Sequence, residues 1–185
     1  RERLKVTSET LQPALEKTLE DLQIEYLDLY LIHFPIALKF VPFEKRYPPE
    51  WLYDPEADDA HMEIDDAPLH ETWAAMEDLV KAGLANNIGV CNYNTNLIHD
   101  LMRYATIKPS MVQVELHPYL TQEKLLKLCA YYSIKVTGFS PLGALSYVPL
   151  EMADKEESLL DHAIIKTISR HHQKTPAQIL LRWGI

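Results

Sequence analysis

The sequence predicts an α/β fold of the (β/α)₈-barrel type, and three observations support this prediction. Short apolar runs typical of buried strands alternate with segments of helical period along the 185 residues. No hairpin signal separates these runs, so the strands are expected to be parallel. Polar side chains mark the carboxyl ends of four successive runs, at His33, Cys91-Asn92, Gln113 and Ser140. A barrel collects its site from many strand ends, whereas the alternative, a doubly wound sheet, concentrates it at one switch point.

Five strands are predicted, over residues 4–8, 26–34, 87–91, 111–116 and 135–139. The run over 26–34 is the clearest, because its Leu, Ile and Tyr content suits a strand that is covered on both faces. Pro35 cannot continue a central strand, so His33 is expected at the carboxyl end of this one. A long polar loop over 36–68 follows it.

Helices are predicted over residues 10–23, 69–82, 95–104, 121–132 and 159–171, and a further one from Thr175 onward. Leucines of the first recur near one face, as in an amphipathic helix. Gly83 is expected to end the second helix. Thr121 is expected to cap the amino terminus of the fourth, and Thr175, followed by Pro176, that of the last.

Composition excludes several classes of protein. A net charge of −9 argues against nucleic acid or an anionic membrane surface as a partner. No apolar run is long enough to span a bilayer, and no secretory signal opens the chain. Two cysteines make neither a disulfide framework nor a metal cluster, which favours the cytoplasm. Glu115 and His117 do not suffice for a metal site. With five glycines, the chain has no Gly-rich phosphate loop.

Six motifs occur in order and together span nearly the whole chain: DLYLIHFP (28–35), ETWAAME (71–77), NIGVCNY (87–93), QVELHPY (113–119), FSPLG (139–143) and TPAQILLRW (175–183). In these motifs the chain resembles the aldo-keto reductases, and most closely their aldose and xylose reductase branch. Residues 36–49 are most similar to those of the sugar-reducing members. The ordered set is far more specific than any one motif.

The resemblance implies reduction of an aldehyde or aldose to the alcohol, with NADPH, or alternatively NADH, as the hydride donor and without a metal. Family members use a tyrosine as general acid, tuned by a lysine and an aspartate, beside a histidine. A neighbouring ammonium stabilises the phenolate and so eases proton transfer near neutral pH. We further expect a cytoplasmic protein that is a monomer or a weak dimer.

The roles of individual residues follow from the same resemblance. His33 matches the catalytic histidine that faces the substrate carbonyl. Cofactor contacts are implied for seven residues: Cys91, Asn92 and Gln113 at the nicotinamide carboxamide, Phe139 stacking on the ring, and Ser140, Leu142 and Gly143 near the pyrophosphate and ribose. Phe34 and Trp51 are expected to line the substrate pocket. Cys91 departs from the serine that the family usually has, and Phe139 from the common tyrosine.

No residue of this chain matches the family's tyrosine, lysine or aspartate. We therefore expect residues 1–185 to form a single reductase domain that is incomplete at both ends. A segment is expected to be absent between Ser8 and Glu9, and another near Trp183. Two alternatives stay open, namely a non-catalytic relative that binds the cofactor and a truncated, inactive isoform.

Overall fold

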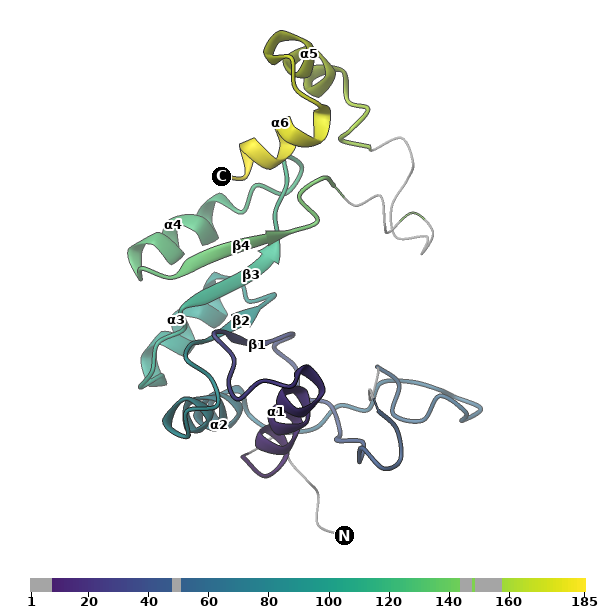
Figure 1. The fold of residues 1–185 in the computed structure, drawn as a ribbon, viewed down its shortest axis with the longest axis vertical. Coiled ribbons are helices and arrows are strands. Elements are labelled where there is room, and N and C mark those ends of the chain that lie inside the picture. Colours follow the sequence, from purple (N-terminus) through teal and green to yellow (C-terminus); the bar gives the residue numbers. More distant parts are fainter. Residues whose placement is uncertain (1–7, 48–50, 144–147, 149–157) are drawn as a thin grey trace. The chain divides into compact units, whose positions relative to one another are not determined.

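The computed structural model describes residues 8–47, 51–143, 148 and 158–185, and Figure 1 follows the chain through them. The chain divides into two compact units, Arg1–Met111 and Val112–Ile185. Each unit alternates helices with strands, which is the pattern of an α/β protein. The α/β class predicted from the sequence is thereby confirmed.

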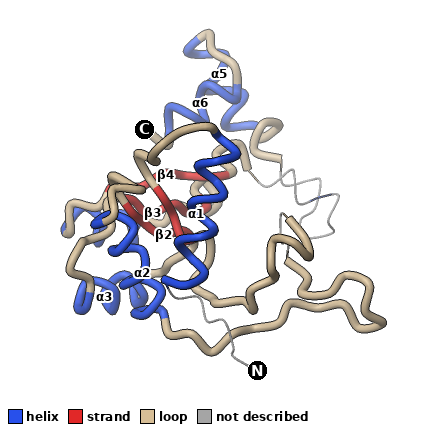
Figure 2. The backbone as a smooth tube through the Cα atoms, turned by 60° about the horizontal axis from the view of Figure 1, so that its bottom comes forward, coloured by secondary structure: helices blue, strands red, loops and turns tan. Residues whose placement is uncertain are grey.

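Unit 1 contains five elements: α1 (Ser8–Leu22), β1 (Tyr30–Ile32), α2 (Leu69–Lys81), β2 (Ile88–Cys91) and α3 (Thr95–Tyr104). Strands β1 and β2 run parallel, with Tyr30 opposite Ile88 and Ile32 opposite Val90. A parallel bridge between Leu27 and Ala85 precedes this ladder. The strands are drawn in red in Figure 2. Parallel pairing puts the carboxyl ends of β1 and β2 at the same edge, where His33 and Asn92 follow them.

The core of unit 1 forms around β2, all four residues of which are buried. Helix α2 turns an apolar face inward through Trp73, Met76 and Leu79, which are at most 2% exposed, and it packs against α1. Gly89 lies where no side chain fits, because a Cβ atom there would come within 2.3 Å of the Met111 carbonyl oxygen. A strand this tightly enclosed fixes where its carboxyl end lies.

The ends of the unit 1 helices follow from local chemistry. Gly83 takes φ 75° just after α2, as the sequence predicts for a residue that ends a helix. The side chain of Asn94 caps α3 by accepting a hydrogen bond from the Leu97 N–H at 3.0 Å. Helix α1 already includes Ser8, so the predicted strand over 4–8 is wrong at Ser8, and its other residues lie outside the described ones.

The loop over residues 36–68 closes at its base. Leu38 and Ile64 form an antiparallel bridge. On either side of it, the Lys39 N–H donates to the Glu63 carbonyl at 2.9 Å and the Asp65 N–H donates to that of Ala37 at 2.8 Å. The two ends of the loop are thus joined, and the described residues between them form an arm that begins and ends beside β1 and α2.

Unit 2 contains α4 (Glu123–Tyr131), β4 (Lys135–Phe139), α5 (Ala163–His172) and α6 (Pro176–Trp183). It also holds all of β3 (Met111–Glu115) after its first residue. Strand β4 lies beside β3, to which α4 connects it, and the Leu116 N–H donates to the Phe139 carbonyl at 3.1 Å. The described residues therefore contain four of the five predicted strands.

In unit 2, one of the predicted helix starts is confirmed and two are wrong. Thr175 caps α6 as predicted and forms a complete capping box with Gln178. The prediction for α4 is wrong, because Gln122 is its N-cap residue, with φ 51° and no capping hydrogen bond from its side chain. The helix predicted from residue 159 begins only at Ala163, because Leu159 lies in the preceding turn.

Candidate active site

His33 follows directly on the last residue of β1, where the sequence predicts it. Its side chain is exposed and lies against two aromatic rings. The centroid of its imidazole is 4.5 Å from that of the Phe34 ring and 5.6 Å from that of the Trp51 indole. The Phe34 and Trp51 rings contact each other edge to face at 5.2 Å. The three residues predicted to face the substrate from unit 1 therefore lie together.

These three residues line a pocket of about 520 Å³. Its other walls come from β1, from the loop over 36–68 and from the inner faces of α1 and α2, and they are mostly apolar. Lys39 and Glu63 also line it, and their side chains form an ion pair. A volume of this order is within the range of small-molecule sites in proteins. Sequence reasoning missed this ion pair, because no local pattern connects the two ends of the loop.

Asn92, which follows the end of β2, holds the backbone of His33. Its side-chain Nδ2 donates to the His33 carbonyl oxygen at 2.8 Å. Asn92 itself has φ 61°, a left-handed conformation that asparagine tolerates better than most residues. Its Oδ1 and its second N–H form no hydrogen bond within the described part of the chain, so they can serve a ligand.

Cys91, the last residue of β2, is buried and only 4% exposed. Burial raises the pKa of the Cys91 thiol, because a thiolate loses solvation there. The side chain is therefore a neutral thiol near pH 7. A thiol is a weak hydrogen-bond donor and acceptor, so it offers a ligand less than serine would.

In unit 2, Gln113 lies in the middle of β3 and is half-buried. The prediction that it marks the carboxyl end of its strand is therefore wrong, because two further residues continue β3 beyond it. Among the residues that the structure describes, no partner takes up its side-chain amide, which can both donate and accept. Phe139 is the last residue of β4 and is also half-buried, so part of its ring remains open to contact.

A tight turn follows β4 and contains the other three predicted residues of unit 2. The Gly143 N–H donates to the Ser140 carbonyl at 2.9 Å and closes the turn, which also includes the half-buried Leu142. Ser140 and Gly143 have φ 49° and 89°. A Cβ atom at Gly143 would lie 3.0 Å from Leu159, so this position needs glycine for space as well as for conformation.

The side chains of Glu115 and His117 contact each other. His117 is 6% exposed, and its Nε2 lies 3.0 Å from Glu115 Oε1. The structure gathers no set of three or more histidine, cysteine or acidic side chains suited to a metal ion within the residues it describes. Over those same residues, no helix has the length and apolar character needed to cross a membrane.

Helices alternate with strands, and a histidine, an amide and aromatic rings gather at the strand carboxyl ends. The protein is therefore of the α/β class that builds its site at that end of the strands. The sequence profile of the aldo/keto reductase family matches residues 3–185. The chain belongs to the aldo/keto reductase family, which confirms the resemblance found in the sequence.

Curated relatives narrow the similarity within that family. A probable NAD(P)H-dependent D-xylose reductase of Aspergillus clavatus is 46% identical over 179 residues, which are 96% of this chain and 53% of that protein. The NAD(P)H-dependent D-xylose reductase I,II of Candida tropicalis is 48% identical over 176 residues, or 94% of this chain and 53% of that protein. The chain thus spans about half the length of the curated relatives it matches.

Among solved structures, an aldose reductase from Schistosoma japonicum superposes with a TM-score of 0.77 at 32% sequence identity. The match covers 96% of this chain and 52% of that one. This likeness is consistent with a (β/α)₈ barrel, of which the chain represents a part.

Proposed function

We propose that the protein is an NADPH-dependent reductase that converts aldehydes, including aldoses, to alcohols. The observation that carries this proposal is the position of His33, at the carboxyl end of a half-buried parallel strand and in the wall of a roughly 520 Å³ pocket. The names of the D-xylose reductases that the chain resembles support the same reaction, with NADH as the alternative cofactor.

His33 has the geometry for binding a carbonyl group. In the neutral form of its exposed imidazole, one ring nitrogen donates a hydrogen bond to the substrate oxygen. Such a bond orients the carbonyl and favours the negative charge that develops on its oxygen. The cofactor, when bound, supplies the hydride to the carbonyl carbon; the oxygen takes a proton, and the product is the alcohol. The family's tyrosine is the expected donor of that proton.

Several other residues fit a nicotinamide cofactor. Asn92 and Gln113 each retain donors and acceptors that suit a carboxamide, since amides pair with one another through both groups. Phe139 offers an aromatic face for stacking. The Ser140–Gly143 turn has a left-handed backbone at Ser140 and at Gly143, and Gly143 has no side chain, which suits close approach of a phosphate or ribose. Cys91 would contribute only a weak contact.

The partners and location that we propose follow from composition. The substrate is a small aldehyde or a sugar, and the acidic net charge of −9 does not suit nucleic acid. Both cysteines are free and buried, which suits a reducing cytoplasm. We propose a monomer or a weak dimer.

The test is oxidation of NADPH in the presence of xylose or glyceraldehyde, with the purified protein. A chimera is assayed beside it, in which this chain replaces the matching portion of the Candida tropicalis enzyme. His33→Gln should lower kcat by about 100-fold or more and leave the dissociation constant of NADPH unchanged. His61→Gln is the matched control, because His61 is another exposed histidine of unit 1.

Two results would contradict the proposal. Equal losses of turnover and of cofactor affinity in His33→Gln would show that His33 does not face the carbonyl. A folded chimera that binds NADPH but turns over no aldehyde would favour a non-catalytic, cofactor-binding relative. Circular dichroism and a melting curve establish in each case that the chimera has folded.

A further inference from the structure

The imidazole of His33 contacts two aromatic rings, those of Phe34 and Trp51. Within the described residues, none forms a hydrogen bond with either ring nitrogen, so no polar partner sets the rotation of the ring. The backbone of His33, in contrast, is fixed through its carbonyl by Asn92. The direction in which the ring nitrogens point therefore depends on Phe34 and Trp51.

Of these two rings, Trp51 is the informative one. Phe34 is next to His33 in sequence and would lie nearby in almost any fold. Trp51 comes from the loop over 36–68, and its indole contacts both His33 and Phe34 while 47% of the residue is exposed to solvent. These two ring contacts stabilise the position of the Trp51 indole on the loop.

The loop is anchored close to Trp51 on both sides. The Arg46 guanidinium donates to the carbonyl of Leu52 and, at 3.4 Å, to that of Tyr53, so it fastens the residues immediately after Trp51. The closed base of the loop, with the ion pair of Lys39 and Glu63, fixes its ends.

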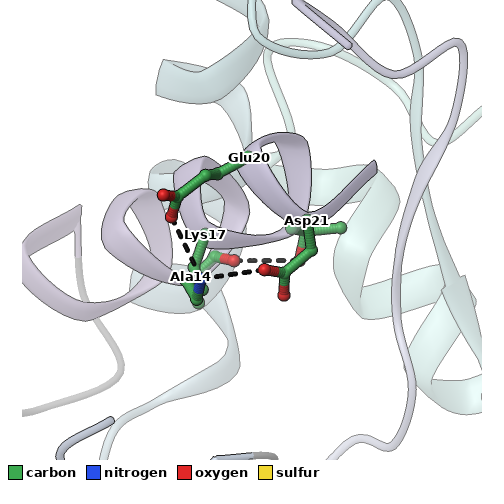
Figure 3. A network of polar contacts seen from close by, with 5 residues as sticks. Ala14, Lys17, Glu20 and Asp21 are labelled. Atoms are coloured by element: carbon green, nitrogen blue, oxygen red, sulfur yellow. Dashed lines mark hydrogen bonds and ion pairs between the residues drawn. The ribbon is translucent and has the colours of Figure 1, made fainter. Parts of the chain in front are cut away.

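A second anchor joins the loop to α1. The Lys17 ammonium lies 5.6 Å from the centre of the Tyr47 ring and pairs with Asp21 at 2.8 Å and Glu20 at 3.0 Å. Figure 3 shows Lys17 between these two carboxylates. A hydrogen bond to Asp21 raises the pKa of the Tyr47 phenol, because it is lost when the phenol ionises. The part of the loop that precedes Trp51 is thus tied to a helix.

We propose that Trp51 is a positioning residue for His33, which sets the orientation of the imidazole from the anchored loop. The catalytic meaning of this proposal rests on the proposed function, whereas the ring contact itself does not. A residue that only lined the substrate pocket would alter KM for large aldehydes. A residue that orients His33 lowers kcat for every aldehyde, including the smallest.

The first test is spectroscopic and does not require turnover. Two-dimensional ¹³C–¹H spectra of the histidine rings are recorded for the wild type and for Trp51→Ala, Trp51→Phe and Trp183→Ala. The His33 signals are identified by their loss in His33→Gln. Trp51→Ala should move the His33 signals more than those of the other seven of the eight histidines. Trp51→Phe should move them less, because a ring remains. Trp183 is the control, since it is 46% exposed and lies on α6.

The second test is kinetic, in the enzyme that reduces aldehydes. Trp51→Ala should lower kcat by a similar factor for glyceraldehyde and for xylose, leave the KM of NADPH unchanged, and be largely rescued by Trp51→Phe. Unmoved His33 signals in Trp51→Ala, with turnover intact, would overturn the positioning role and leave the proposed function standing. If the His33 signals move but the protein has no turnover, the contact between His33 and Trp51 is supported and the proposed reductase function is contradicted. A rise in KM for xylose alone would show that Trp51 only lines the substrate pocket, and would contradict the positioning role.

Discussion

Replacing Glu77 should destabilise unit 1 at a place remote from any ligand. Glu77 lies on α2, is 6% exposed, and its Oε1 accepts hydrogen bonds from the backbone N–H groups of Thr106 at 2.6 Å and Ile107 at 3.0 Å. On the preceding turn of the helix, the Trp73 indole N–H donates to the Ile107 carbonyl at 3.1 Å. Together the two side chains fasten the segment that leads from α3 to β3.

The expected cost follows from these partners. A hydrogen bond to a charged group contributes about 1.5–3 kcal/mol, and a buried donor left without a partner costs about 1–3 kcal/mol. Thr106 is exposed, so water replaces part of its bond, whereas Ile107 is half-buried. Glu77→Ala should therefore lower the free energy of unfolding by about 2–4 kcal/mol. Glu77→Gln keeps an acceptor oxygen without the charge and should cost about 1 kcal/mol.

The assay combines urea unfolding with hydrogen exchange. Asp78→Asn is the control, because Asp78 neighbours Glu77 on the same helix but has a 58% exposed side chain, so it should stay within about 0.5 kcal/mol. Exchange at the Thr106 and Ile107 amides should accelerate in Glu77→Ala. Equal losses in the Gln and Ala variants would refute the role of the acceptor oxygen. If the urea midpoint of Glu77→Ala equalled that of the control, the Glu77 side chain would have no stabilising role at all.

Two further predictions concern β2. Gly89→Ala should lower the melting temperature, at a cost of about 1–3 kcal/mol or more, because the new Cβ would lie 2.3 Å from the Met111 carbonyl oxygen and 2.7 Å from Leu31; an unchanged melting curve would contradict this packing. Cys91 should react with iodoacetamide more slowly in the folded protein than in urea near pH 8, because burial raises the pKa of its thiol, which keeps the thiolate fraction low until the pH rises further. Equal rates in the two states, measured by mass spectrometry, would show that Cys91 is accessible and ionised.

Most strands and helices could be predicted, because burial leaves a pattern in the sequence. The helix predicted over 95–104 matches α3 at both ends, and the strand over 135–139 matches β4. The strand predicted over 26–34 is shorter in the structure, where its ladder covers only Tyr30–Ile32. An apolar run indicates that its side chains avoid water, whereas a hydrogen-bonded ladder also requires a partner strand in register with it.

The start of α4 could not be predicted from the sequence, for a physical reason. Gln122 precedes it in a left-handed conformation, and no residue type other than glycine signals a positive φ reliably. The helix predicted from residue 159 begins too early because Leu159 is an apolar residue shortly before α5 and is buried, as a helix residue facing the core would be. Its side chain instead packs on Gly143 from a turn. Periodicity does not distinguish these two ways of burying a leucine.

At the candidate site, too, one feature could be predicted from the sequence and another could not. The position of His33 could be predicted from Pro35, because a proline limits where a buried strand ends. The contact between His33 and Trp51 could not, since it depends on how the loop over 36–68 folds back. No local pattern encodes the bridge between Leu38 and Ile64 that closes this loop.

Asn92 shows why a residue assigned to the cofactor by resemblance also has a structural task. The ladder of β1 and β2 ends with Ile32 opposite Val90, and Asn92, the residue after β2, has a left-handed φ of 61°. The carbonyl of His33 lies one residue beyond this ladder, and the Asn92 side chain donates a hydrogen bond to it at 2.8 Å. Aspartate at position 92 would place an acceptor against an acceptor, and alanine would leave the carbonyl unpaired. The amide thus extends the pairing of the strands by one residue with a side chain, and this residue is the one that carries the imidazole.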